Sequence, residues 1–205
     1  MPSANIIELE SCIDDCIAYC DENPKSEFST LYREKLLRAR HRWEKAVRLS
    51  DEQHTKWRSE QREERLAWKH LAATLRESQR QLRRVGAIDF PDRRILYWDE
   101  EALMVHVERM QEYLREHGND LDFAQELLDR FEREIDAATG EEREADSALK
   151  DYQRFVDIRR EAMTELGSMI GDFRIALRRG LGKRHPAYQK IHWPHAIASD
   201  EGVLF

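Results

Sequence analysis

Apolar side chains recur at every third or fourth residue along most of this chain, and the steps alternate between four and three. Between residues 99 and 180 the stripe consists of Leu103, Val107, Met110, Leu114, His117, Leu121, Ala124, Leu128, Phe131, Ile135, Ala138, Glu142, Ala145, Leu149, Tyr152, Val156, Arg159, Met163, Leu166, Ile170, Phe173 and Leu177. An earlier stripe of the same kind consists of Trp43, Val47, Ser50, His54, Trp57, Gln61, Glu64, Trp68, Leu71, Leu75, Ser78, Leu82 and Val85. This spacing is typical of helices that pack side by side. The pattern therefore predicts an all-α protein.

The stripes and the residues that interrupt them predict three helices, over residues 3–21, 26–84 and 99–180. Pro24 separates the first two, because proline cannot continue a helix and disfavours helix in the residue before it. We expect these helices to form a single elongated bundle domain over residues 1–182.

Two segments lack the helical period. Residues 85–98 contain Gly86 and Pro91 among apolar side chains, and we expect an ordered loop in which Trp98 and its neighbours cover the end of the bundle. Residues 183–205 are predicted to form an irregular tail, basic and apolar, with one short helical turn near residues 187–191.

The third predicted helix has two possible breaks, at residues 118–120 and 139–140. Gly118 followed by Asn119 and Asp120 is a stop signal followed by N-cap residues, and Thr139 begins a capping-box pattern. The heptad spacing passes through both positions unchanged. We therefore favour one nearly continuous helix, with a hairpin at either break as the alternative.

The width of each stripe predicts how the helices pack. From Ala148 onward, the position before each stripe residue is also apolar, and the second helix is widened in its early part by Tyr32, Ala39 and Ala46. A wide stripe needs two neighbouring helices, whereas a narrow stripe needs only one. We expect an antiparallel helical hairpin, or coiled coil, thickened to three or four helices near the termini. A second copy of the chain is expected to complete the thin end.

The net charge of the chain limits which kinds of partner it could bind. Of 205 residues, 37% are charged, and the net charge is −7. An acidic chain is a poor match for nucleic acid or an anionic membrane. The chain contains no run of about 18 apolar residues, so no transmembrane helix is expected. Its first residues lack the pattern of a signal peptide. We expect a cytoplasmic location, no membrane association and no dedicated nucleic-acid binding.

Three cysteines, Cys12, Cys16 and Cys20, are spaced four residues apart and should line one face of the first helix. This spacing resembles the Cys-x-x-x-Cys pairs of four-helix copper storage proteins. The resemblance implies a bundle that binds Cu(I) or zinc through these thiols. The alternative is that they are small apolar residues of a buried face. We favour the alternative and predict no bound metal and no cofactor. If a metal is bound, Cys12, Cys16 and Cys20 are the candidate ligands.

Between Phe173 and Ser199 there are basic residues but no acidic ones. Such a patch could bind an anion or an acidic partner, although cations also favour the C-terminal end of a helix. The candidates are Arg174, Arg178, Arg179, Lys183, Arg184 and Lys190.

The polar residues within the stripes, such as His54, Glu64 and Glu142, are interpreted as layers that fix register or partner choice. The chain contains no nucleophile elbow, zinc-protease motif or glycine-rich nucleotide loop. We therefore expect a non-enzymatic structural or protein–protein interaction protein, a scaffold or adaptor that associates with itself. The metal-binding bundle is the alternative function. Trp57 could serve either the helix pairing or an interface.

Overall fold

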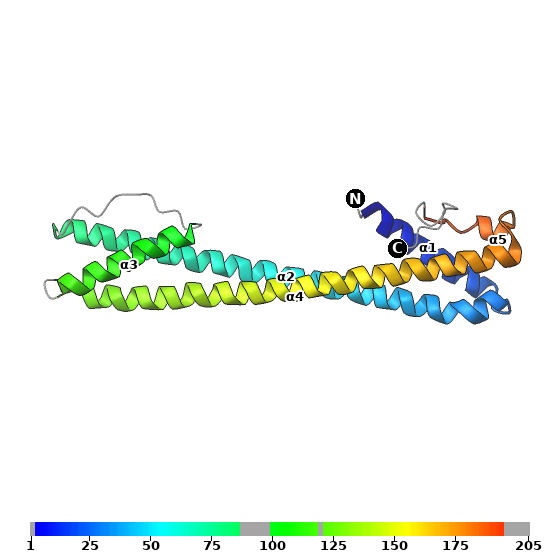
Figure 1. Ribbon diagram of the computed structural model, residues 1–205, viewed down its shortest axis with the longest axis horizontal. Helices are drawn as coiled ribbons and strands as arrows, with labels where there is room; N and C mark the ends of the chain where they lie inside the picture. Colours follow the sequence, from blue (N-terminus) through cyan, green and yellow to red (C-terminus); the bar gives the residue numbers. More distant parts are fainter. Residues whose placement is uncertain (1–2, 87–98, 119–120, 195–205) are drawn as a thin grey trace. The chain divides into compact units, whose positions relative to one another are not determined.

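The computed structural model describes residues 3–86, 99–118 and 121–194, with side chains from Ile6 onward. These residues contain no strand, and the fold is all-α, as predicted. Two long helices, α2 and α4, pack closely as an antiparallel hairpin (Figure 1). The helices are α1 (Ser3–Glu22), α2 (Glu27–Arg84), α3 (Glu100–His117), α4 (Ala124–Leu181) and α5 (Pro186–Gln189).

Local hydrogen bonds explain the turn between α1 and α2. The side-chain amide and the backbone N–H of Asn23 both donate to the Tyr19 carbonyl, at 2.9 and 3.0 Å, at the end of α1. The Ser26 hydroxyl accepts from the backbone N–H of Ser29 at 3.1 Å, which is the geometry of an N-cap. Pro24 lies between these two caps, where it interrupts neither helix.

The chain divides into two compact units. Unit 1 combines the residues up to Glu52 with those from Gln153 onward, and unit 2 comprises residues 53–152. Each long helix contributes to both units. The expectation of a single domain over residues 1–182 stays a prediction.

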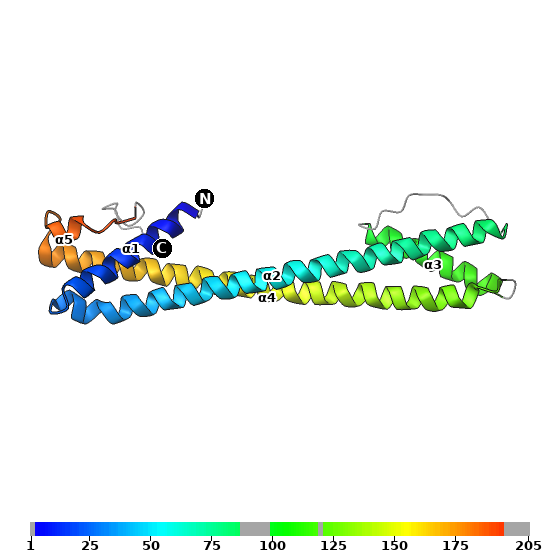
Figure 2. The same cartoon turned by 180° about the vertical axis from the view of Figure 1, so that it is seen from behind.

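The core of unit 1 contains α1 as its third helix. Side chains of α1 such as Cys16 pack in one cluster with Leu36 and Trp43 of α2 and with Ile170 and Phe173 of α4. Figure 2 shows α1 crossing the two long helices obliquely in this unit. The predicted thickening to three helices near the termini is therefore confirmed.

The core of unit 2 contains α3 as its third helix. Leu103, Val107 and Met110 of α3 are fully buried against Leu75 of α2 and Phe131 of α4. We expected a second copy of the chain to complete the end distant from the termini. Within unit 2, the same chain supplies the third helix over part of that length.

The favoured continuous helix over residues 99–180 was wrong. Helix α3 ends at His117 and α4 begins at Ala124, with backbone hydrogen bonds from Leu121 to Gly118 and from Ala124 to Leu121 closing the turn. The heptad spacing survives across this turn because each helix needs its own apolar stripe. The two stripes can follow one another without a shift even when a turn separates their helices. An unbroken heptad spacing in the sequence therefore does not indicate an unbroken helix.

The second proposed break, at residues 139–140, does not occur, because α4 runs through it. The Thr139 hydroxyl donates to the Ile135 carbonyl at 2.9 Å, as a threonine inside a helix does, and it does not act as a cap. Glycine disfavours helix by about 1 kcal/mol relative to alanine, which does not break a well-packed helix at Gly140.

The segment after α4 folds back onto α1 within unit 1. Gly182 adopts a left-handed backbone with φ of 86°, and α5 follows close to the predicted short turn. Tyr188 and Ile191 enter the core of unit 1. Both the backbone N–H and the imidazole of His192 contact the carboxylate of Asp15, at 3.0 and 2.9 Å.

Some sequence predictions fall outside the described residues. They include most of the loop predicted over residues 85–98, with Trp98, and the last part of the tail, from residue 195 onward.

Candidate interaction site

The three cysteines of α1 are enclosed in the core of unit 1. Cys12, Cys16 and Cys20 are each 0% exposed and free of disulfides. The Sγ atoms of Cys12 and Cys16 lie 4.0 Å apart, a weak S–H···S contact. The predicted row of thiols is therefore present, and it packs among apolar side chains of the unit 1 core.

The surroundings of these thiols disfavour the thiolate form that binds metals. The contact with Cys12 and burial raise the pKa of Cys16, and Cys20 and Asp15 raise it further. Burial also raises the pKa of Cys20, although the Ser29 hydroxyl and Arg33 act in the opposite direction. Soft metals require deprotonated cysteines, so this setting favours neutral thiols that pack as small apolar groups.

Arg174 and Lys190 of the predicted basic patch bind side chains within unit 1. Arg174 Nε donates to the Tyr188 hydroxyl at 2.9 Å and thereby holds the segment that follows α4. Lys190 Nζ lies 3.4 Å from a carboxylate oxygen of Glu22 on α1. Both side chains hold the C-terminal segment in place. These contacts give the two residues a structural role that does not depend on anion binding.

The other four residues of the patch lie at or just beyond the end of α4, and all are exposed. Cations at this end of a helix interact favourably with its free carbonyl groups. Anion binding by this group stays a prediction. The four residues are Arg178, Arg179, Lys183 and Arg184.

Unit 2 contains a stretch in which α2 and α4 pack without a third helix among the described residues. The stripe residues covered by α3, such as Leu71 and Leu75, are 0% exposed. Beyond the first residues of α3 the same stripes become partly exposed. We call the following residues the open seam: His54, Trp57, Gln61, Leu149 and Tyr152.

Aromatic side chains dominate the open seam. The rings of Trp57 and Tyr152 stack with 5.6 Å between centroids and an interplanar angle of 4°. The His54 ring lies 5.1 Å from that of Tyr152 and 5.8 Å from that of Trp57. Aromatic pairs of this kind hold two helices together, and all three residues stay partly exposed.

Charges around the open seam are sorted by sign. We consider the two facing segments, residues 53–66 and 139–152. Within them, every lysine and arginine is exposed, whereas the partly buried charged side chains are all glutamates. In the described part of the chain, no salt bridge involves any of these glutamates. They are Glu60, Glu64, Glu141 and Glu142.

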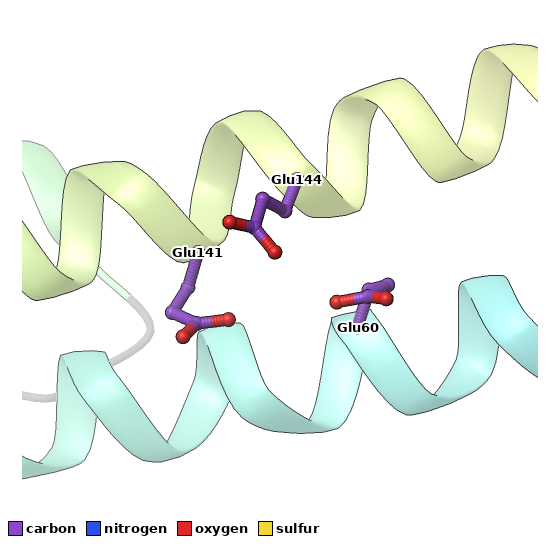
Figure 3. Close-up of side chains that lie close together, drawn as sticks. All are labelled: Glu60, Glu141 and Glu144. Atoms are coloured by element: carbon purple, nitrogen blue, oxygen red, sulfur yellow. The ribbon is translucent and has the colours of Figure 1, made fainter.

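Three carboxylates meet between the two long helices of this unit. Glu60 of α2 and Glu141 and Glu144 of α4 point toward one another (Figure 3), with ligand oxygens all within 4.8 Å. Burial raises the pKa of Glu141, and the charges of Glu144, Glu63 and Glu60 raise it further. One oxygen of Glu141 is enclosed without a hydrogen-bond partner.

A second set of acids lies where α3 begins. Burial raises the pKa of Glu64, and the neighbouring charges of Glu100, Glu142 and Asp146 add to the effect. Burial and Glu142 likewise raise the pKa of Glu100, the first residue of α3. The open seam is therefore bordered by carboxylates that repel one another.

The carboxylates could in principle hold a cation. Calcium takes about six to eight oxygen ligands, and magnesium needs a near-ideal octahedron. The three facing carboxylates supply only part of such a set. The same oxygens can also accept hydrogen bonds from an ammonium or guanidinium group.

Sequence reasoning identified His54, Glu64 and Glu142 as polar members of the stripes but did not bring them together. It also missed Glu60, Glu141 and Glu144 as a group. The sequence does show three glutamates within residues 60–64 and three within residues 141–144. Only the pairing register of α2 with α4 reveals that these two sets face each other.

None of the described helices has the length and apolar character that crossing a membrane requires. No protein-family model matches the chain, and comparison with curated proteins and with solved structures gives no significant match.

Proposed function

We propose that this chain is a non-enzymatic interaction protein, a scaffold or adaptor, that binds a protein partner along the open seam. The observation that supports this proposal is the incomplete burial of Trp57 and Tyr152 in unit 2. On α2, the same stripe is fully buried at Leu71, Leu75 and Leu82, where α3 covers it. A protein partner would bury these rings in the way that α3 buries Leu71 and Leu75.

The composition of the open seam is that of an interface. Tryptophan and tyrosine are enriched among residues that carry most of the binding energy, because they combine a large apolar area with little conformational freedom. The stacking of Trp57 on Tyr152 also fixes both rings before a partner arrives. Preorganised rings lower the entropy that binding costs.

Self-association, which the sequence led us to expect, has a specific difficulty at this surface. A symmetric dimer places the same patch of both copies in contact. A two-fold axis parallel to the helices would then oppose Glu60 and Glu141 of one copy to the same acids of the other, and any arrangement of two seams adds negative charge. Light scattering at several protein concentrations tests for self-association, and a mass that stays at one chain would exclude it.

Recovery of a native partner tests the proposed function. The double variant Trp57→Ala/Tyr152→Ala should lose a partner that the wild type retains. Leu66→Ala is the matched control, because Leu66 is also on α2 in unit 2 but is 46% exposed and lies outside the open seam. Circular dichroism should show that both variants keep their helices. Equal recovery by wild type and double variant would refute the proposal.

Metal binding by the three thiols remains a second candidate, which only the 4.0 Å separation of the Cys12 and Cys16 sulfur atoms favours. Two sulfur ligands of one soft metal ion lie about this far apart, given a Zn–S bond of about 2.3 Å. Titration of wild type and Cys16→Ala with zinc and with Cu(I) tests it. Equal binding by the two proteins would end this alternative.

A further inference from the structure

The open seam combines an apolar surface with partly buried glutamates that form no salt bridge within the described residues, and both features restrict what can cover it. Trp57, Leu149 and Tyr152 require an apolar partner surface. Partly buried carboxylates are costly without a counter-charge, because burial removes water from them and neighbouring acids repel them. The raised pKa values of Glu64 and Glu141 reflect both effects.

These two requirements discriminate between the available occupants. A metal ion would compensate the carboxylates but would leave the aromatic rings uncovered. A second open seam would cover the rings but would add the same negative charges. A helix with one apolar stripe and flanking lysine or arginine residues satisfies both requirements, since its stripe packs on the rings while its cations meet the glutamates.

The unit itself supports a helix as the occupant. In unit 2, α3 covers the α2–α4 pair with an apolar stripe of Leu103, Val107 and Met110. Its first residue, Glu100, lies near Glu64 and Glu142, so the α3 covering stops where the acids begin. A helix that approached this acidic segment with further acids of its own would be repelled, whereas a basic helix would be attracted.

We propose that the open seam of unit 2 binds a basic amphipathic helix of another protein, with the glutamates bordering the seam as the partners of its lysine and arginine side chains. This inference rests on the proposed function and names the chemistry of the partner. Arginine would add contacts with the faces of Trp57 and Tyr152, because a guanidinium group is attracted to aromatic rings.

A synthetic helical peptide is the probe. It carries a leucine stripe flanked by lysines, and two comparison peptides carry glutamate in place of lysine or the same residues in scrambled order. Fluorescence anisotropy of the labelled peptides measures Kd with the full-length protein. We expect the lysine peptide to bind at least tenfold more tightly than either comparison peptide, and its Kd to increase as salt is raised from 50 to 300 mM.

Charge variants of the protein locate the binding. Glu60→Gln/Glu141→Gln should weaken binding of the lysine peptide on the order of tenfold, which corresponds to about 1.4 kcal/mol. Glu108→Gln/Glu112→Gln is the matched control, because it removes two exposed charges from α3 in the same unit. The first variant loses like-charge repulsion and should melt no lower than wild type, so weaker binding would not reflect unfolding.

Three results would overturn the inference. They are equal binding of the lysine and glutamate peptides, equal weakening by the two double variants, and a concentration-dependent dimer that Glu60→Gln/Glu141→Gln strengthens. The last result would identify a second copy as the occupant. If the peptide fails but Trp57→Ala/Tyr152→Ala still loses a native partner, the proposed function stands and only the basic helix is refuted.

Discussion

Replacing Gly140 and Gly180 of α4 with alanine should change stability in opposite directions. At Gly140 an added Cβ meets no other atom within 4 Å, and the residue lies inside the helix. Alanine should therefore stabilise the protein by about 0.5–1 kcal/mol, the usual difference between the two residues in a helix. At Gly180 an added Cβ would overlap the ring of Phe28 on α2, within unit 1.

The magnitude at Gly180 follows from two opposing effects. The helical preference of alanine again contributes about 0.5–1 kcal/mol. Making room for the methyl group costs about 1–3 kcal/mol, because the partly buried Phe28 ring must leave its preferred position. Gly180→Ala should therefore be less stable than Gly140→Ala by about 1–3 kcal/mol, which is the range of the packing cost alone.

Urea unfolding followed by circular dichroism measures both changes. The control is the same Gly180→Ala substitution in a Phe28→Ala background, where the overlap is absent and alanine should again stabilise the protein. Destabilisation by Gly140→Ala would refute the reasoning and would indicate that the helix breaks at residues 139–140. A Gly180→Ala protein as stable as Gly140→Ala would show that the Phe28 ring moves at no cost.

Three further predictions concern acids, thiols and the C-terminal segment. Lowering the pH from 7 to 5 should stabilise unit 2, because the pKa values of Glu64, Glu100 and Glu141 are raised above 4.5 in the folded state. As the pH falls, the folded state therefore binds protons before the unfolded state does, and this stabilisation is lost as the pH rises through the raised pKa values. Urea unfolding at both pH values checks this, and an undiminished gain in Glu64→Gln/Glu141→Gln would contradict it. A thiol reagent such as DTNB should modify none of the three cysteines in the native protein and all three after unfolding; prompt native reaction of Cys16 would show that the core opens readily. Tyr188→Ala should destabilise unit 1 by about 2–4 kcal/mol, measured by urea unfolding, because it removes a buried aromatic group. His192→Ala should cost less than about 1 kcal/mol, because its imidazole is exposed. Similar effects of the two substitutions would refute a packed role for Tyr188.

Apart from the turn between α3 and α4, the sequence alone determined the helical segments and the faces that they bury. Spacing of apolar residues is set by the geometry of the α-helix, so Leu71, Phe131 and Ile170 could be assigned to a core without knowing their partners. Pro24 marked the boundary between the first two helices because its effect on the backbone is local. For the same reason the row of thiols on α1 was visible, although its burial was not.

The tertiary structure decided everything that depends on which helices meet. It placed the turn at Gly118, because α3 gains more by covering α2 and α4 than by extending α4, and the sequence period is the same in either case. It also brought Glu60 next to Glu141, from positions far apart in the chain. The open seam exists only because α3 covers part of the pair and leaves the rest. The periodic pattern specified which residues needed a partner surface, and only packing determined which of them found one within the chain.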